Sequence, residues 1–301
     1  MDVQVDLHVH HYLVRLRRAP ASRGATAKLP ACWRTSVITL PFDPVALRAG
    51  PLVLAWHGIF TSLGLLSGMW LAMRLAPAAG IDSDAVARAT WWIVGGGIIG
   101  ARLLFAAENP EGFAGAPLRF LFINEGGISV FGAVLGGIAG AALWAHRAGT
   151  PARRLLDAVA PAFLFGQAIG RIGDVINGEH WGEHAPGLPW SVVYTHPDTL
   201  AEAGVPVHSA VAYELLWDLA AGALVVWWLQ RQGRSGSHRS TPGVALWLAL
   251  LLYGIGRLWV GFYRLDQRVT LGLGLAQLIG LIVLPIALAG LWHAFTARRQ
   301  A

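Results

Sequence analysis

The sequence predicts an all-α, polytopic membrane protein with about seven transmembrane helices and a polar extracytoplasmic region. Of its 301 residues, 55% are hydrophobic and 13% are charged, whereas soluble domains carry about 25% charged residues. The chain also holds 14 tryptophans, and indole side chains favour the boundary between lipid and water. These observations argue against an ordinary soluble domain.

Seven apolar stretches are candidate membrane spans, since a span needs about 20 mostly apolar residues. In chain order they cover approximately residues 52–75, 91–107, 126–145, 155–169, 210–229, 243–263 and 271–295. The second and fourth are short and interrupted by glycines, so they match the required length least well. Tryptophans stand at several of the expected ends, as interface residues do: Trp91, Trp92, Trp227, Trp228 and Trp292.

Arginines gather in alternate connections between the spans, and this pattern predicts the orientation. The connection between the third and fourth spans, the one between the fifth and sixth, and the C-terminal tail contain Arg147, Arg153, Arg154, Arg231, Arg234, Arg239, Arg298 and Arg299. Basic connections stay in the cytoplasm. Alternation then places the N-terminus outside, the C-terminus in the cytoplasm, and the long acidic connection 171–209 outside.

The segment 1–36 departs from this pattern, because it is basic although alternation places it outside. It shows no sustained periodicity, and we predict that it is disordered or precedes a true start at Val37. Residues 37–301 then form a single transmembrane domain. The one cysteine, Cys32, excludes an intramolecular disulfide and a cysteine-based metal cluster. The net charge of +6 fits basic loops at an anionic leaflet, and no nucleic-acid partner is expected.

A polar segment, 170–182, follows the fourth expected span. Ionisable groups at the edge of a bilayer are costly and therefore tend to mark a site. Glycines between them let backbone and ligand approach closely. The polar side chains of the segment are Arg171, Asp174, Asn177, Glu179 and His180.

This segment, with Gly170-Arg171-Ile172-Gly173, Asn177-Gly178-Glu179 and Gly182, resembles the signature of the prolipoprotein diacylglyceryl transferases. Other stretches resemble the same family, in the same order along the chain. They are Phe42-Asp43-Pro44-Val45, Gly100-Ala101-Arg102-Leu103, Glu125-Gly126-Gly127-Ile128-Ser129, His208 with Tyr213-Glu214, and Tyr253-Gly254 with Arg257. The resemblance therefore extends from about residue 40 to 290.

The resemblance implies a reaction and its partners. Enzymes of this family move the diacylglyceryl group of phosphatidylglycerol onto the thiol of the lipobox cysteine in the signal peptide of a preprolipoprotein, and glycerol phosphate leaves. They work among membrane lipids at the outer side of the bacterial cytoplasmic (inner) membrane, without a metal or cofactor. Two alternatives remain open: a divergent member that modifies another acceptor, and a lipid-binding membrane protein without catalysis.

The chain departs from the family's usual pattern at several polar positions. Phe131 stands where the family has a histidine, and Gly261 where it has a glutamate. Asp174 replaces the usual asparagine of the signature, and His57 the usual tyrosine of the first span. Ser209 begins the stretch that replaces Pro-Ser-Gln before the fifth span.

Such a reaction needs cations for the lipid phosphate. Arginine suits this task, because its planar guanidinium binds phosphate through two donors and stays charged. Arg171 and Arg257 are the main candidates, against the alternatives that Arg171 only pairs with a carboxylate of its own loop and that Arg257 only extends towards the interface. The resemblance adds further residues to the phospholipid site: Asn177, Gly182, Arg102 and Tyr253.

The reaction also needs a base, because a free thiol with a pKa of about 8.5 is only slightly ionised at neutral pH. His57 and His180 are the candidates near the outer side, with Asp174 and Glu179 as orienting or proton-accepting carboxylates. The alternative for either histidine is a hydrogen-bonded packing role.

Two further patterns predict structural roles. Glu214 lies four residues before Asp218 on one helix face, and we expect Glu214 to pair with an arginine of a neighbouring span rather than to act as an acid or base. The glycines at 95–97 and at 136, 137 and 140 predict close helix packing.

Overall fold

The computed structural model describes residues 37–50, 52–114, 120, 129–234, 241–266 and 268–300. The predictions for the segment 1–36 and for Cys32 lie outside these residues. The chain divides into two compact units, which among the described residues comprise 81–155 and, for the second, 37–80 with 156–300. The expectation of a single domain from 37 to 301 stays a prediction.

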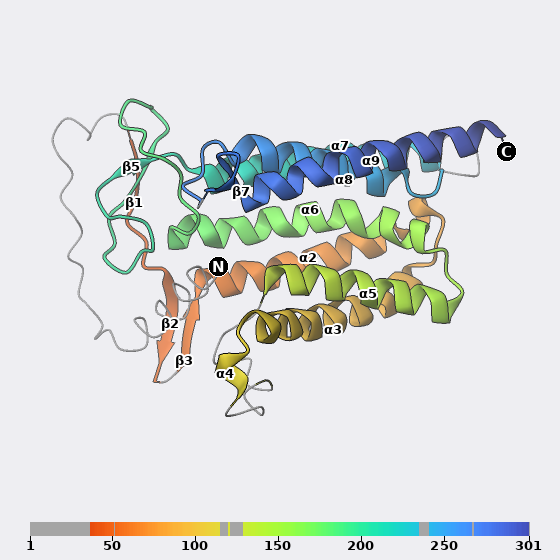
Figure 1. Cartoon of the computed structure of the whole chain (residues 1–301), viewed down its shortest axis with the longest axis horizontal. Helices are drawn as coiled ribbons and strands as arrows, with labels where there is room; N and C mark the ends of the chain where they lie inside the picture. Colours follow the sequence, from red (N-terminus) through yellow and green to blue (C-terminus); the bar gives the residue numbers. More distant parts are fainter. Residues whose placement is uncertain are drawn as a thin grey trace. The chain divides into compact units, whose positions relative to one another are not determined.

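The described part of the chain is mostly helical (Figure 1). Its helices are α2 (Trp56–Ala79), α3 (Ser83–Glu108), α4 (Glu111–Ala114), α5 (Val130–Ala148), α6 (Ala152–Asn177), α7 (Ala210–Arg234), α8 (Val244–Val260) and α9 (Leu275–Gln300). Among the described residues, α2, α3, α6, α7 and α9 are long and apolar enough to cross a membrane, and α8 is a shorter apolar helix. The predicted class, a helical polytopic membrane protein, is confirmed.

Two expected boundaries are wrong in ways that matter for the site. The first span begins at Trp56, because residues 52–55 form a strand. The fourth span does not end at residue 169: α6 continues to Asn177, and Gly178 ends it with a φ of 71°. Most of the polar segment is therefore helical, and Arg171, Asp174 and Asn177 lie at three-residue spacing along it.

The unit comprising 81–155 is built on close contact between α3 and α5. A Cβ placed on Gly100 would lie 2.3 Å from the carbonyl oxygen of Gly132, and one on Gly96 would lie 2.4 Å from that of Gly136. Two backbones can approach this closely only where both lack side chains. The packing predicted from the glycines is confirmed.

The other unit contains α2, α6, α7, α8 and α9, which also pack closely at glycines. Gly166 of α6 lies against Gly64 of α2, where an added Cβ would be 2.7 Å from a carbonyl oxygen. Along α8, Gly256 accommodates the indole of Trp217 from α7, and Gly254 lies against α9. These small residues bring the polar ends of the helices within reach of one another.

Short strands accompany the helices of this unit (Figure 1). One sheet has the order β1 (Ile38–Leu40), β4 (Val192–Tyr194), β5 (Pro206–Val207), with β1 parallel and β5 antiparallel to β4. The hairpins are β2 (Val45–Ala49) with β3 (Leu52–Ala55), and β6 (Arg268–Thr270) with β7 (Leu273–Gly274). The sheet's own apolar core consists of Val192, Tyr194, Ala201 and Val207, against which Leu40, Trp181 and Val205 pack. These strands depart from a purely α-helical expectation.

Candidate active site

The end of α6 carries the first elements of the site. Arg171 and Asp174 lie one turn apart, and an Arg171 guanidinium NH donates to Asp174 Oδ2 at 2.6 Å. The Asp174 side chain is only 4% exposed, so this contact compensates a carboxylate that burial would otherwise penalise.

His57 reaches the same carboxylate from α2. A Cβ on Gly173 would lie 2.7 Å from the Cα of His57, so only glycine at position 173 allows α2 this close. His57 Nδ1 lies 2.5 Å from Asp174 Oδ1 and 3.5 Å from Glu179 Oε2. The imidazole is 45% exposed while Asp174 is buried. His57 is therefore the accessible end of a buried polar chain.

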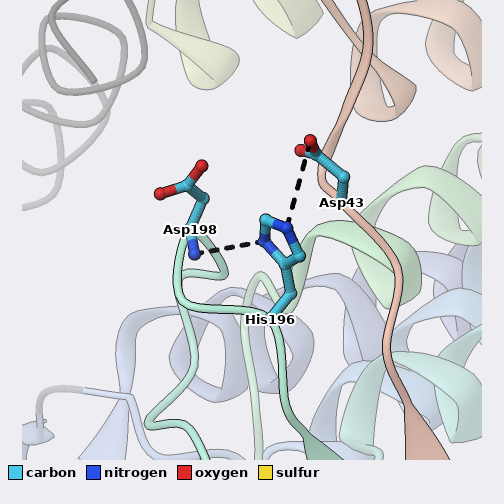
Figure 2. A group of neighbouring side chains, drawn as sticks. All are labelled: Asp43, His196 and Asp198. Carbon is cyan, nitrogen blue, oxygen red and sulfur yellow. Dashed lines mark hydrogen bonds and ion pairs between the residues drawn. The ribbon is translucent and has the colours of Figure 1, made fainter. Parts of the chain in front are cut away.

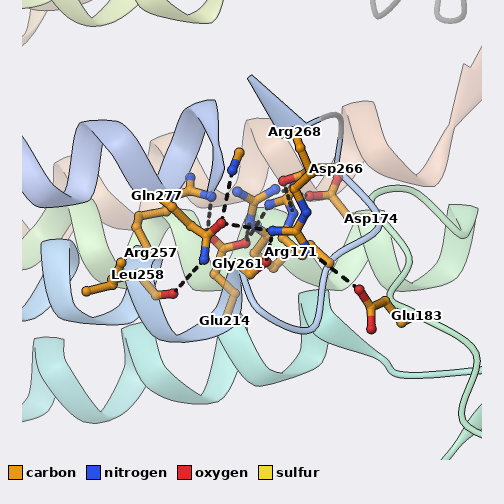
Figure 3. A network of polar contacts seen from close by, with 12 residues as sticks. Arg171, Asp174, Glu183, Glu214, Arg257, Leu258, Gly261, Asp266, Arg268 and Gln277 are labelled. Carbon is orange, nitrogen blue, oxygen red and sulfur yellow. Dashed lines mark hydrogen bonds and ion pairs between the residues drawn. The ribbon is translucent and has the colours of Figure 1, made fainter. Parts of the chain in front are cut away.

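Glu214, in the first turns of α7, is the centre of a second group of charges (Figure 3). Its carboxylate lies 3.2 Å from Arg171 Nε, 2.5 Å from an Arg257 NH and 3.5 Å from an Arg264 NH. The expected pairing of Glu214 with an arginine of a neighbouring helix is confirmed. One carboxylate thus fixes three guanidinium groups, and Arg171 joins this group to the His57–Asp174 pair.

Arg257 is also held by its own helix. Its Nε donates to the Tyr253 hydroxyl at 2.9 Å, and its guanidinium lies 5.1 Å from the centre of the Tyr253 ring. A cation over an aromatic face is attracted by the ring's quadrupole. The alternative role for Arg257, extension towards the membrane interface, does not apply, because its guanidinium points to Glu214.

The turn after α6 orders Asn177 and Glu179. Asn177 Nδ2 donates to Glu179 Oε1 at 3.1 Å. Burial raises the pKa of the Glu179 carboxyl above its ordinary value, because the charged form loses hydration. Asn177 Oδ1 is buried and has no hydrogen-bond partner among the described residues.

Gly182 has a clear steric reason to be glycine. A Cβ there would lie 2.5 Å from the carbonyl oxygen of Tyr263 and 2.6 Å from the Cβ of His208. Its N–H donates to the carbonyl of His208 at 2.9 Å, and it forms an isolated β-bridge with Arg264. The position joins the turn after α6 to the segment that carries Arg264.

His180 has a different setting from His57. It adopts a left-handed backbone conformation, with a φ of 50°. Loss of hydration lowers the pKa of the imidazole to about 4, with the guanidiniums of Arg264 and Arg171 as further causes, although the residue as a whole is exposed. The shift favours the neutral form of His180.

Arg102 belongs to the unit comprising 81–155. Its Nε donates to the carbonyl of Phe120 at 2.8 Å, and its guanidinium lies 5.3 Å from the centre of the Phe113 ring. It is 4% exposed. These contacts favour a structural role for Arg102 within that unit, and its expected part in the phospholipid site stays a prediction.

A third polar group lies near the sheet and is formed by Asp43, His196 and Asp198 (Figure 2). His196 Nδ1 accepts the backbone N–H of Asp198 at 3.2 Å, so the ring proton is on Nε2, which faces Asp43 Oδ2 at 4.0 Å. Asp198 in turn pairs with Arg48 of β2 at 3.3 Å. Through these contacts His196 ties the chain segments of Asp43 and Asp198 together.

Two residues of the site escaped the sequence analysis. Arg264, seven residues after Arg257, is 7% exposed and contacts Glu214. Gln277 was not considered, although it is the third residue after Gly274, where a glutamine can cap a helix start. For each residue, its distance along the sequence from Arg257 or from Gly274 was the signal that could have predicted its place in the site.

The arrangement offers two chemical capacities side by side. Arg171 and Arg257, already ordered by Glu214, can bind an anion through planar donors. His57, oriented by Asp174, can accept a proton at its other ring nitrogen, since a carboxylate at Nδ1 fixes the tautomer.

Comparison with known proteins identifies the family. The family model described as prolipoprotein diacylglyceryl transferase matches residues 44–293. The phosphatidylglycerol–prolipoprotein diacylglyceryl transferase of Synechococcus elongatus is 33% identical over 260 residues, which are 85% of this chain and 89% of that protein. Proteins of the same name from Trichormus variabilis and Gloeobacter violaceus are each 32% identical, over 85% and 86% of this chain and 91% and 96% of their own lengths. The chain therefore belongs to the prolipoprotein diacylglyceryl transferase family.

Proposed function

We propose that this protein transfers the diacylglyceryl group of phosphatidylglycerol to the lipobox cysteine of a preprolipoprotein, the first step of lipoprotein maturation. The names of its relatives support these substrates. The observation that carries the proposal is the contact of Arg171 with both Asp174 and Glu214. It supports an anion site beside the imidazole of His57, which contacts the same Asp174.

The phosphate of the lipid binds between Arg171 and Arg257. Both side chains are largely buried, with exposures of 14% and 16%, so their field acts in a low-dielectric setting. Asn177, Gly182 and Tyr253 support them through the contacts described above. Positive charge here stabilises the negative charge that develops on the leaving phosphate.

His57 takes the proton of the acceptor thiol. The thiolate then attacks the glycerol carbon that carries the phosphate ester: a carbon–sulfur bond forms, the carbon–oxygen bond breaks, and glycerol phosphate departs with the electron pair. Asp174 and Glu179 stabilise the imidazolium that forms, as the carboxylate of a catalytic triad does. The proton later leaves His57 for the product phosphate or for water.

His57 is a better base than His180. Proton transfer from a thiol with a pKa of about 8.5 is strongly uphill to a group whose pKa is about 4. The carboxylates that would balance an imidazolium lie at His57, whereas the charges of Arg264 and Arg171 contribute to lowering the pKa of His180. We assign His180 to the ordering of the turn after α6.

The site faces the outer side of the bacterial inner membrane, with the N-terminus outside and the C-terminus in the cytoplasm. The basic connections and tail support this orientation by the positive-inside rule. The residues concerned are Arg147, Arg153, Arg154, Arg231, Arg234, Arg239, Arg298 and Arg299.

The test is complementation in bacterial cells depleted of their own transferase, with mass spectrometry of the lipobox cysteine as readout. The unaltered protein should restore the diacylglyceryl thioether, and Arg171→Ala should abolish it at equal membrane abundance. His57→Asn should also abolish it, while His180→Asn should not. Absence of thioether from the folded, unaltered protein contradicts the proposal, and consumption of phosphatidylglycerol in that case points to another acceptor.

A further inference from the structure

Gln277 occupies the space that a side chain at position 261 would need. Gly261 follows the last residue of α8, and a Cβ built there would lie 2.3 Å from Gln277 Cγ and 2.7 Å from its Cδ. Gln277 stands in the first turn of α9 and is 1% exposed. The Gln277 side chain, which comes from α9, thus fills the space that a side chain at position 261, at the end of α8, would occupy.

The amide of Gln277 is hydrogen bonded on both sides (Figure 3). Its Oε1 accepts from an Arg268 NH and from the backbone N–H of Gly274, both at 3.0 Å. Its Nε2 donates to the carbonyl of Leu258 at 3.3 Å. A buried side-chain amide has two acceptor and two donor positions, and three of these four are used.

These bonds join the end of α8 to two other segments. Leu258 directly follows Arg257, so Gln277 holds the turn that carries this arginine. Arg268 also donates to the carbonyl of Gly261 and to Glu183 Oε1, each at 3.5 Å, and Glu183 belongs to the loop after Gly182. The same amide therefore connects the turn of Arg257, the β6–β7 hairpin and the chain beyond α6.

The packing of α9 leaves this turn little freedom. A Cβ on Gly280 would lie 3.5 Å from the Cβ of Arg257 and 2.9 Å from the carbonyl oxygen of Gly254. Arg257 is thus flanked by α9 on the backbone side while its guanidinium reaches Glu214. A displacement of the end of α8 would therefore move the base of the Arg257 side chain relative to Glu214.

We propose that Gln277 is a positioning residue for the phospholipid phosphate: its amide holds the end of α8 so that Arg257 meets the lipid in the correct place. This inference rests on the proposed function, since it takes Arg257 as a phosphate ligand. It further assigns positions 261 and 277 as one exchangeable pair, in which a polar group supplied from either helix can hold the turn.

The experiment compares purified full-length variants reconstituted in phosphatidylglycerol nanodiscs. Gln277→Met keeps the volume and removes the amide, while Gly261→Gln with Gln277→Ala supplies the amide from α8. Gly261→Gln alone tests the steric conflict. Thr296→Val is the control in α9, because among the described residues the Thr296 hydroxyl bonds only to carbonyls of its own helix, at 3.0 and 3.1 Å.

Two readouts separate this inference from the proposed function. The first is transfer to a synthetic lipobox peptide, with KM measured for each substrate; the second is binding of phosphatidylglycerol alone, by titration of a labelled lipid. Loss of a buried hydrogen-bonding group that orders a charged ligand weakens binding roughly tenfold. Gln277→Met should raise the KM and Kd for the lipid by this factor and leave the peptide KM near that of the unaltered protein.

The double variant should recover lipid affinity that Gly261→Gln alone loses, and Thr296→Val should change nothing. Unaltered lipid affinity in Gln277→Met, an equal rise of both KM values, or a double variant no better than Gly261→Gln would overturn the inference. If the unaltered protein transfers no lipid, the proposed function fails, and the binding titration still decides the role of Gln277.

Discussion

His57 and Asp174, 117 residues apart in the sequence, meet at 2.5 Å between Nδ1 and Oδ1. The sequence resemblance leads one to expect tyrosine and asparagine at these two positions. The contact is formed instead by an imidazole and a carboxylate, which can share a proton.

The first prediction concerns this pair. Either single change, His57→Tyr or Asp174→Asn, should lower transfer by about 10²–10⁴-fold, because each leaves the other partner without its counterpart. The double variant should be more active than either single one. A double-mutant cycle on thioether formation measures the coupling, for which about 0.5–3 kcal/mol is typical of residues in contact. Simple additivity of the two effects contradicts a shared role.

The second prediction concerns Gly182. A methyl group at this position would clash with the carbonyl oxygen of Tyr263 and the Cβ of His208, at 2.5 and 2.6 Å. Gly182→Ala should therefore displace the turn that follows α6 and abolish most transfer. Gly187 is the matched control, because a Cβ there has nothing within 4 Å. Thioether yield and membrane abundance should be normal for Gly187→Ala. Equal activity of both variants refutes the steric explanation.

The third prediction follows from the pKa of His180, lowered to about 4. The unfolded chain binds a proton at this histidine below pH 6.5, whereas the folded protein does so only near pH 4. Stability should therefore fall as pH decreases from 6.5 towards 4, and change little through this group above 6.5. Thermal unfolding at half-unit steps of pH measures the slope, which His180→Asn should reduce. A slope that persists in this variant assigns the effect to other groups.

The fourth prediction concerns Asp157, a buried carboxylate of α6. It accepts the backbone N–H of Gly243 at 2.6 Å and that of Leu246 at 2.9 Å, and so caps the start of α8 from another helix. Asp157→Ala leaves these donors unsatisfied and should lower the free energy of unfolding by about 1–3 kcal/mol. Asp82→Ala is the comparison, since Asp82 caps α3 locally at an exposed position; its cost should be about 1 kcal/mol. Denaturant unfolding in detergent checks both values.

The membrane architecture could be predicted from the sequence because it follows from composition and the length of apolar runs. The helical continuation of α6 could not, since glycines and polar residues between 170 and 177 also have the composition of a loop. In the fold these glycines allow α2 to approach, as Gly173 does against His57. The two-residue strand β5 is too short to leave a pattern of its own.

The arginines of the site were partly predictable. Arg171 and Arg257 stand in recognisable motifs, and the pairing of Glu214 followed from the cost of a buried charge. The contact between His57 and Asp174 depends on the packing of α2 against α6, and no local sequence pattern predicts it. For Gln277 the spacing after Gly274 was the only sequence signal, because its role depends on the space that Gly261 leaves in the fold.

Glu214 acts as a resident counter-ion. Arg171, Arg257 and Arg264 would repel one another without it, and in its presence they stay in register before any lipid arrives. In the proposed mechanism, an incoming phosphodiester shares these cations with Glu214, which is part of the chain and stays in place. Such sharing would limit how tightly the protein retains an anionic product, and would favour the departure of glycerol phosphate and the next catalytic cycle.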